Sequence, residues 1–545
     1  MAGIADFLDS LIGGFDLICF CLTIGGLMWG LFVLRPWNAI EGMNPALLNK
    51  TIRLIYIGGF LLAAAQLFKI ILKVWLMTAI LHRWPFPEFS HTTQFTGGII
   101  RTGLILILAG YCYLSLRKHP FSEEHWTKAG LFSLPMLVSG AWLVHAAGRF
   151  DNQVFLMSFT VLHQLAAAAW IGSVFQLVNL WLLRNKEKIP AEFWPLLLKR
   201  FSPFGMASVA MILVSGIPIA WQYIDTWNGL VGTGYGNLLL VKVTLLALAL
   251  SLAWLNKSAV IAYGKSGNGY SLNHRVPYYI EAETFILVAL LFTAASLASQ
   301  PPAIDIPNLT ASWQEVLNTF SPQIPQTSSP SHSDLLAGEA GRVAIVGQVP
   351  SIAATEWSNY NHNISGIFLT VMSLFAMLSY LSKSAFERLK FWPLGFVLLG
   401  MFLFVRSDAE TWPLGPIGFW DSTFNNGEVL QHRIATLVVF VLGVIEIRAR
   451  MPENKNNNLP LVFPVLAAFG GLMLLTHSHV GFQAKSAFLI QVGHTTMGIF
   501  SLMLACGRWL ELKLDKPGKN LAGFISVTAL FQMGLILMFY REPLY

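Results

Sequence analysis

Long apolar runs dominate this chain. Fourteen of them, most about 20 residues long, recur along its 545 residues. A helix needs about 20 apolar residues to cross roughly 30 Å of hydrocarbon, and lipid offers the backbone no hydrogen-bond partner outside the helix itself. Only 12% of the residues are charged, against about 25% in an ordinary soluble domain. The sequence therefore predicts an all-α fold: a polytopic integral membrane helical bundle of about 14 transmembrane helices.

The predicted spans fall into two groups. A polar stretch at 299–360, rich in proline and serine, separates the first eight runs from the last six. We expect an eight-helix membrane domain at 1–298, a Pro/Ser-rich loop facing outside at 299–360 and a six-helix membrane domain at 361–545. The runs lie at 15–34, 52–80, 96–116, 127–148, 154–183, 203–224, 237–256, 277–298, 361–382, 391–405, 428–447, 460–477, 486–507 and 521–540.

The basic residues assign sides to these spans. Of the 35 Lys and Arg residues, 24 fall in loops on one side of the predicted membrane and 7 in loops on the other. The positive-inside rule places the richer side in the cytoplasm, so both termini are expected outside. The high pI is then a consequence of topology, and we expect the lipid bilayer as a partner and no nucleic acid.

The histidines are distributed with the opposite bias. Only three of the thirteen lie in predicted cytoplasmic loops, and the other ten lie outside or in the outer half of a span. Imidazole is a common metal ligand, so a metal ion outside the membrane is the first candidate to explain this bias. The ten are His82, His91, His145, His163, His332, His362, His432, His477, His479 and His494.

Two histidines mark a candidate site in the first group of spans. His163 lies about ten residues into the fifth run, and His145 lies near the outer end of the fourth. One ion could bind both if the helix ends are staggered, and two successive sites are an equal alternative. A purely structural interhelical hydrogen bond would also explain a buried His163. Met157 and His91 are possible additional ligands.

A second candidate site belongs to the last six spans. His477 and His479 close the twelfth run, and His494 lies about eight residues into the thirteenth. Glu428 and His432 are four residues apart at the start of the eleventh run, so they share a helix face. We expect the other four to converge near the outer boundary, with His494 beneath them. The alternatives are a solvated loop for the first two histidines and a simple helix-end pair for Glu428 and His432.

Other charged and sulfur-containing residues are expected to be structural. Arg433 would repel a cation unless it pairs elsewhere, for example with Asp408 or Glu410. The four cysteines are expected to be buried small apolar residues. No P-loop, GxSxG or HExxH motif is present in the sequence, so we do not expect an enzyme.

Four stretches in combination resemble the copper-resistance D (CopD) family of bacterial inner-membrane proteins, across about residues 10–305. They are Thr93–Gly98 with Arg101; Gly140–Gly148 with Leu162, His163 and Trp170–Gly172; Arg200–Ser202 with Ser215 and Gly216; and Gly234–Val243 with Leu255 and Asn256.

The resemblance implies copper transport across the bacterial inner membrane, from periplasm to cytoplasm. The outer side of the chain, including both termini, would then be periplasmic. His145 and His163 match the histidine positions of the family. The chain departs from the pattern at Val144, where the family often has glycine, and it carries no fused soluble copper-binding domain.

The last six spans resemble an extension found in longer members of the family. The similar segments are Trp412–Trp420, Glu428–Arg433, His477–His479 and His494.

These observations predict a carrier whose outward-facing histidines bind a copper ion and pass it inward. Its expected partners are the copper ion and a periplasmic copper-binding protein. Two other functions stay open. The protein could be a b-type haem electron carrier, because helical histidines also serve as haem ligands. It could also be an assembly or sensing protein that donates copper without transporting it.

Overall fold

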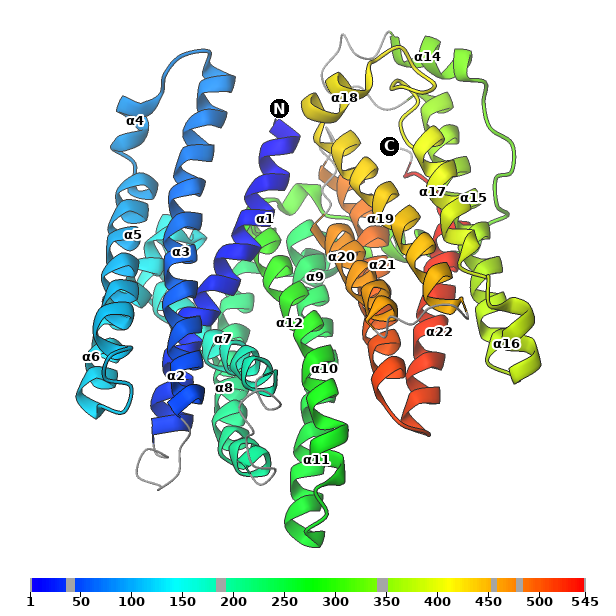
Figure 1. The fold of residues 1–545 in the computed structure, drawn as a ribbon. Coiled ribbons are helices and arrows are strands. Elements are labelled where there is room, and N and C mark those ends of the chain that lie inside the picture. Colours follow the sequence, from blue (N-terminus) through cyan, green and yellow to red (C-terminus); the bar gives the residue numbers. More distant parts are fainter. Residues whose placement is uncertain are drawn as a thin grey trace. The chain divides into compact units, whose positions relative to one another are not determined.

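The computed structural model describes residues 2–35, 45–182, 193–340, 351–451, 458–476 and 484–543. Within these residues the chain is helical and forms no β-strand, apart from one isolated bridge between Thr411 and Ile417 (Figure 1). Thirteen helices in this part of the chain are long and apolar enough to cross a membrane. The predicted fold class, a polytopic helical membrane protein, is confirmed.

The long helices follow the predicted runs closely. In the first group they are α1 (Ala2–Phe20), continued through 21–34, α3 (Pro45–Leu81), α5 (Thr93–Tyr111), α6 (Glu123–Ser139), α7 (Gln153–Trp181), α8 (Phe193–Tyr223), α10 (Gly234–Ser266) and α12 (Val276–Ser299). In the second group they are α15 (Ile352–Ser379), α17 (Leu394–Arg406), α19 (Gly427–Arg450), α20 (Val462–Thr476), α21 (Ala484–Lys513) and α22 (Gly518–Met538).

The predicted fourth span differs from expectation. Its helix, α6, has 17 residues and ends at Ser139, and two short 3₁₀ turns at 140–143 and 145–148 follow it. Gly140 lies where the chain passes the guanidinium of Arg101, so closely that an added Cβ would lie 2.5 Å from Nη1. Between the two turns Val144 is extended, which ends the helical path. The run at 127–148 is therefore not among the thirteen spanning helices.

The chain forms two compact units. One comprises Asp9–Asp225 and Leu246–Ser299, and the other comprises Met1–Leu8, Thr226–Leu245 and Gln300–Tyr545. Residues of α10 are thus shared between the units. The division into domains at 1–298, 299–360 and 361–545 stays a prediction.

Glycines allow close helix contacts in the unit that contains Asp9–Asp225. A Cβ on Gly25 would lie 1.9 Å from the carbonyl oxygen of Ala168, and one on Gly172 would lie 2.2 Å from that of Cys21. Small residues at such crossings let helix backbones approach in lipid, where van der Waals packing drives association. Gly172 thus lets the helix that contains Cys21 and Gly25 approach α7. All four cysteines are buried.

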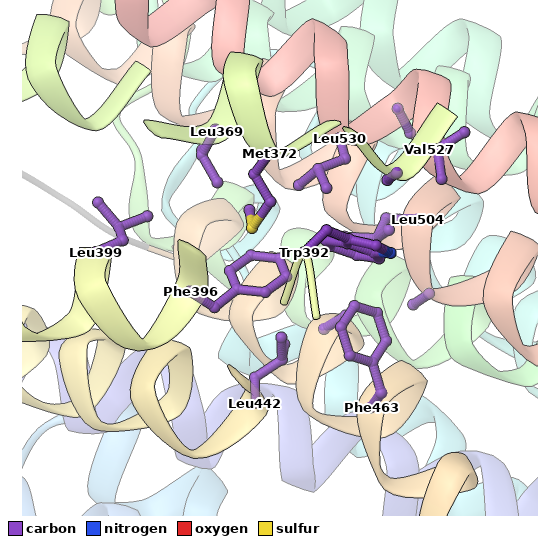
Figure 2. Close-up of a cluster of buried hydrophobic side chains, with 14 residues drawn as sticks. Leu369, Met372, Trp392, Phe396, Leu399, Leu442, Phe463, Leu504, Val527 and Leu530 are labelled. Carbon is purple, nitrogen blue, oxygen red and sulfur yellow. The ribbon is translucent and has the colours of Figure 1, made fainter. Parts of the chain in front are cut away.

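The unit that contains Gln300–Tyr545, called the C-terminal unit below, is stabilised by an apolar cluster. Apart from Trp392, its residues come from six helices. Trp392 lies in the middle of this cluster in Figure 2. A second contact is backbone to backbone, because a Cβ on Gly366 of α15 would lie 2.0 Å from the backbone nitrogen of Met538 in α22. This packing fixes α15, α19, α21 and the end of α22 relative to one another. The labelled members of the cluster are Leu369, Met372, Trp392, Phe396, Leu399, Leu442, Phe463, Leu504, Val527 and Leu530.

Part of the segment 299–360 is attached to this unit by an ion pair. The short helix α13 (Trp313–Asn318) begins with a capping box in which Ser312 and Glu315 bond reciprocally. Lys485 Nζ lies 2.6 Å from Glu315 Oε1. The hydrogen bond from Lys485, with those from Ser312, lowers the pKa of Glu315 from 4.5 to about 2.

Candidate metal sites

His163 joins two neighbouring helices. Its Nδ1 lies 3.1 Å from Ser215 Oγ and 3.2 Å from the carbonyl oxygen of Ile212, both on α8. The Ser215 hydroxyl donates to the carbonyl of Met211 at 2.6 Å, so Nδ1–H of His163 is the donor in these contacts. The ring lies over Gly216, where an added Cβ would be 3.0 Å from Cε1. The structural alternative, an interhelical hydrogen bond, is therefore present.

The same hydrogen bonds also suit a metal ligand. In a neutral imidazole that donates through Nδ1, the lone pair lies on Nε2. Histidines that bind metals usually donate their other ring nitrogen to an oxygen in this way, which fixes the tautomer. His163 is thus compatible with both interpretations, and its role as a ligand stays a prediction.

The other predicted ligands of the first half do not form a described cluster with His163. His145 lies at the start of the second 3₁₀ turn, and its side chain is outside the described part of the structure. Met157 is half-buried on α7, and His91 is exposed at the end of the short helix α4 (Phe86–Ser90). Across the described ranges, no group of three or more His, Cys, Asp or Glu residues is placed to hold a metal ion.

An apolar cavity lies deeper in the same unit. It has a volume of about 370 Å³ and is lined by residues of α7, α8, α10 and α12, including Trp170 and Trp254. Asn256 Nδ2 donates to Glu283 Oε2 at 3.2 Å along its wall. Because the lining is otherwise almost entirely apolar, the cavity does not have the donor set of a copper site.

In the C-terminal unit, two histidines from different helices face each other. The ring centroids of His362 on α15 and His494 on α21 are 6.2 Å apart, and the ring planes meet at 84°. Two imidazoles that share one ion, at about 2 Å from each nitrogen, have centroids about 4.4 Å apart at a right angle and about 6.2 Å apart in a linear arrangement. The geometry of this pair therefore suits a shared metal ion.

The tautomers of the pair agree with that interpretation. His362 Nδ1 donates to the carbonyl oxygen of Ser358 at 2.8 Å, and His494 Nδ1 donates to that of Ile490 at 3.0 Å. A carbonyl oxygen only accepts, so both rings carry their proton on Nδ1 and, when neutral, their lone pair on Nε2. The hydrogen bonds thus favour, for both neutral rings, the tautomer in which Nε2 can bind a metal.

Acidic groups surround this histidine pair. The Tyr540 ring stacks on His362 with centroids 4.1 Å apart. Glu542 Oε2 accepts hydrogen bonds from Tyr540 Oη at 3.0 Å and from Ser358 Oγ at 2.7 Å. Burial, together with the carboxylates of Glu542 and Glu428, raises the pKa of Tyr540 well above its ordinary value. The phenol is therefore a neutral donor, and the negative charge near it favours a cation.

His432 is held by a carboxylate. Its Nδ1 lies 2.9 Å from Asp408 Oδ1. Burial acts to raise the pKa of Asp408, but the charge and hydrogen bond of His432 and the hydroxyl of Ser407 outweigh it and lower that pKa. Glu428, one helical turn before His432, acts electrostatically on this histidine as well as on Tyr540. Glu428 thus connects the two parts of the site.

Arg433 does not use Asp408 as a direct partner. Its Nη1 donates to the carbonyl oxygen of Phe419 and to Thr423 Oγ1, and Nη2 donates to Ser422 Oγ at 3.0 Å. All three acceptors belong to the short helix α18 (Phe419–Asn425), and the guanidinium lies 4.1 Å from the Phe419 ring centroid. The hydrogen bonds of Arg433 thus go to neutral acceptors of α18, whereas Asp408, the predicted partner, bonds to His432 and acts on Arg433 electrostatically.

The predicted convergence of His432, His477, His479 and Glu428 above His494 stays a prediction. His477 and His479 lie outside the described residues. The predicted set contained His432, His494 and Glu428, but it did not contain His362, which is 132 positions before its partner His494. The available signal was weak, since His362 was one of the ten outward-biased histidines but had no neighbouring ligand in sequence.

Comparison with known proteins bears on the first half of the chain. Residues 195–297, which run from α8 to α12, match the family model of copper resistance protein D, CopD. This part of the chain is therefore similar to the membrane helices of copper resistance protein D. The resemblance to CopD seen in the sequence is confirmed for this segment, which contains Ser215 and Gly216 beside His163.

One relative of this chain is the copper transport protein CutJ of Bacillus subtilis (strain 168). It is 31% identical over 222 residues, which are 39% of this chain and 39% of CutJ. The chain thus matches about two fifths of the length of that relative. No solved structure matches the chain.

Proposed function

We propose that this multi-pass membrane protein binds copper ions as its substrate and carries them across a bacterial inner membrane, from periplasm to cytoplasm. The similarity to CutJ, a copper transport protein, carries the proposal. The histidine pair on α15 and α21 supports it with a geometry that suits one ion. The proposal is of a carrier rather than an enzyme.

In this proposal the histidines act as successive binding positions. Imidazole binds copper in either oxidation state, and copper(II) heads the affinity series of divalent first-row metals. An ion must also leave each position, so several moderate sites serve a carrier better than one tight site. His163, His145 and the C-terminal group with His362, His432 and His494 are the proposed positions. A periplasmic copper-binding protein would deliver the ion.

The direction rests on the predicted topology. Ten histidines lie on or near the side that is poor in Lys and Arg, which the positive-inside rule assigns to the periplasm. A reporter fused after Ser329 should be active in the periplasm, and one fused after Lys188 in the cytoplasm. Reversed reporter activities would reverse the proposed direction.

The test of transport uses purified protein in sealed vesicles. Vesicles that contain the protein should take up copper faster than empty vesicles, and His163→Ala should abolish the difference while protein abundance is unchanged. His163→Gln is the sharper variant, because glutamine retains hydrogen bonding to α8 but binds copper poorly. Normal uptake by His163→Gln would make His163 a structural residue. Copper binding without uptake would indicate a protein that donates copper instead.

A b-type haem electron carrier is the second candidate. Two imidazoles on opposite faces of a haem iron have a centroid separation similar to that of His362 and His494. Metal analysis and the visible absorption spectrum of the purified protein separate the two functions. A strong Soret band that is lost in His494→Gln would favour haem, and copper without such a band would favour the carrier.

A further inference from the structure

Charged side chains lie along three membrane helices of the unit that contains Asp9–Asp225. Asp9 and Asp16 are two turns apart on α1, and Lys69 and Lys73 follow Gln66 by three and seven positions on α3. This spacing places each set on one face of its helix. Arg101 lies on α5. All six positions belong to helices that are long and apolar enough to cross a membrane. Ionisable groups inside such helices are costly and usually functional.

These residues act on one another. Gln66 Nε2 donates a hydrogen bond to Asp16 Oδ1. Asp9 and Lys69 are the charged groups that act on Lys73. Lys69 Nζ lies 3.8 Å from the position of a Cβ on Gly13, between the two aspartates along α1. The polar faces of α1 and α3 therefore meet. We call the following residues the charged seam: Asp9, Asp16, Gln66, Lys69, Lys73 and Arg101.

Arg101 is the most unusual member of the charged seam. Only 6% of its surface is exposed, and among the described residues its Nε has no hydrogen-bond partner. Its guanidinium lies 5.7 Å from the Phe20 ring centroid, and Asp16 is the acidic group that acts on it. A buried cation without a directly bonded anion is expensive, so the carboxylate of Asp16 is the counter-charge that keeps Arg101 in this place.

The turn of α1 before Asp16 packs against apolar side chains of α12. Asp16 itself is 5% exposed. On the neighbouring turn of α1, Gly13 and Gly14 face Ala295 and Phe292 of α12, and Cys19 is the titratable group nearest to Asp16 on its own helix. The polar neighbours that the structure gives Asp16 on other helices are thus Gln66 of α3 and the cation of Arg101 on α5.

We propose that Asp16 is a proton-binding site that couples copper movement to the proton gradient; this inference rests on the proposed copper transport. Asp16 is buried in a membrane span, accepts a hydrogen bond from Gln66 and lies near the buried cation of Arg101. Buried carboxylates inside membrane helices are typical members of proton relays. Asp9, Lys69 and Lys73 lie nearer than Asp16 to the end of α1 that the predicted topology places outside.

The step is a simple proton transfer. A proton from water on the outer side forms an O–H bond with the Asp16 carboxylate, and that bond breaks when the proton passes to water on the inner side. No electron is transferred. The proton moves inward together with the copper ion.

The first experiment measures copper uptake into vesicles with an imposed pH gradient, acid outside, and the membrane potential clamped at zero. With one proton per ion, a gradient of about one pH unit should raise copper accumulation about tenfold. Asp16→Asn should bind copper as the parent protein does but lose this increase. Asp151→Asn, which changes an exposed loop carboxylate, is the matched control and should retain it. An Asp16→Asn variant that retains the full increase would overturn the proposal.

A second measurement separates this inference from the proposed function. Infrared difference spectra of the purified protein on acidification should show the C=O stretch of a buried carboxylic acid. This band should be lost in Asp16→Asn, shifted in Gln66→Leu, and unchanged in Asp151→Asn. If the parent protein moves no copper under any gradient, the proposed function fails, and the coupling fails with it. If copper moves but no Asp16 band is found, the coupling alone is refuted.

Discussion

The pair of His362 and His494 makes a quantitative prediction about copper affinity. Removing a residue that hydrogen-bonds to a metal ligand typically lowers metal affinity about 10–100-fold. Removing the ligand itself should therefore lower copper affinity at least about 100-fold, or about 2.7 kcal/mol. His362→Gln and His494→Gln should each show this loss. Their ring centroids are 6.2 Å apart, close enough to share one ion, so the double variant should lose little more than either single variant.

The assay is competition between the purified full-length protein and a chromophoric copper chelator. With two independent sites, each single variant would still bind one ion with parental affinity and only the double variant would lose both, whereas a shared site is weakened by either single variant. His274→Gln, in the short helix α11 (Tyr270–His274), is the control and should bind copper normally. One ion still bound with parental affinity by each single variant, or normal binding by both single variants, would refute the shared site.

Three further predictions concern other parts of the C-terminal unit. Asp408→Asn should weaken copper binding about 10–100-fold in the same competition assay if His432 is a ligand, because the carboxylate orients that imidazole; unchanged affinity would remove His432 from the site. Gly366→Ala should lower thermal stability in detergent by about 1–3 kcal/mol because of its backbone clash, whereas Gly470→Ala, where a Cβ would meet nothing within 4 Å, should not. Glu315 has a pKa of about 2 instead of 4.5, so its ion pair contributes stability above pH 4.5 that is lost as the pH falls towards 2. In thermal melts, Glu315→Gln should therefore lose less stability on acidification than the parent protein. Equal losses in both proteins would contradict the assignment.

The sequence predicted the helices well because hydropathy alone decides which segments enter lipid. The exception is the predicted run at 127–148, whose helix ends at Ser139. Hydropathy contains no information about contacts between helices that interrupt a span. The helix ends there because the chain passes against Arg101, and that contact depends on how α5 and α6 pack. Apolar composition was equally compatible with a continuous helix through Gly140.

The candidate site was predictable only where it is local. Glu428 and His432 act together because they are one turn apart on α19, a spacing visible in the sequence. The pairing of His362 with His494 and of His432 with Asp408 joins different segments of the chain, and a single sequence does not state which helices are neighbours. Arg433 was correctly expected to need a partner, but α18 could not be recognised as that partner from its residues.

The early end of α6 affects the surrounding bilayer. A helix of 17 residues is about 26 Å long, which is less than the roughly 30 Å of an average hydrocarbon core. The 3₁₀ turns that follow interrupt the helical hydrogen-bond pattern, and lipid offers their backbone no other partner. A thinner membrane beside α6, or water that reaches these turns, would satisfy both features. Either way, a hydrated ion approaching His145 crosses less hydrocarbon there than at the full-length helices of the same unit.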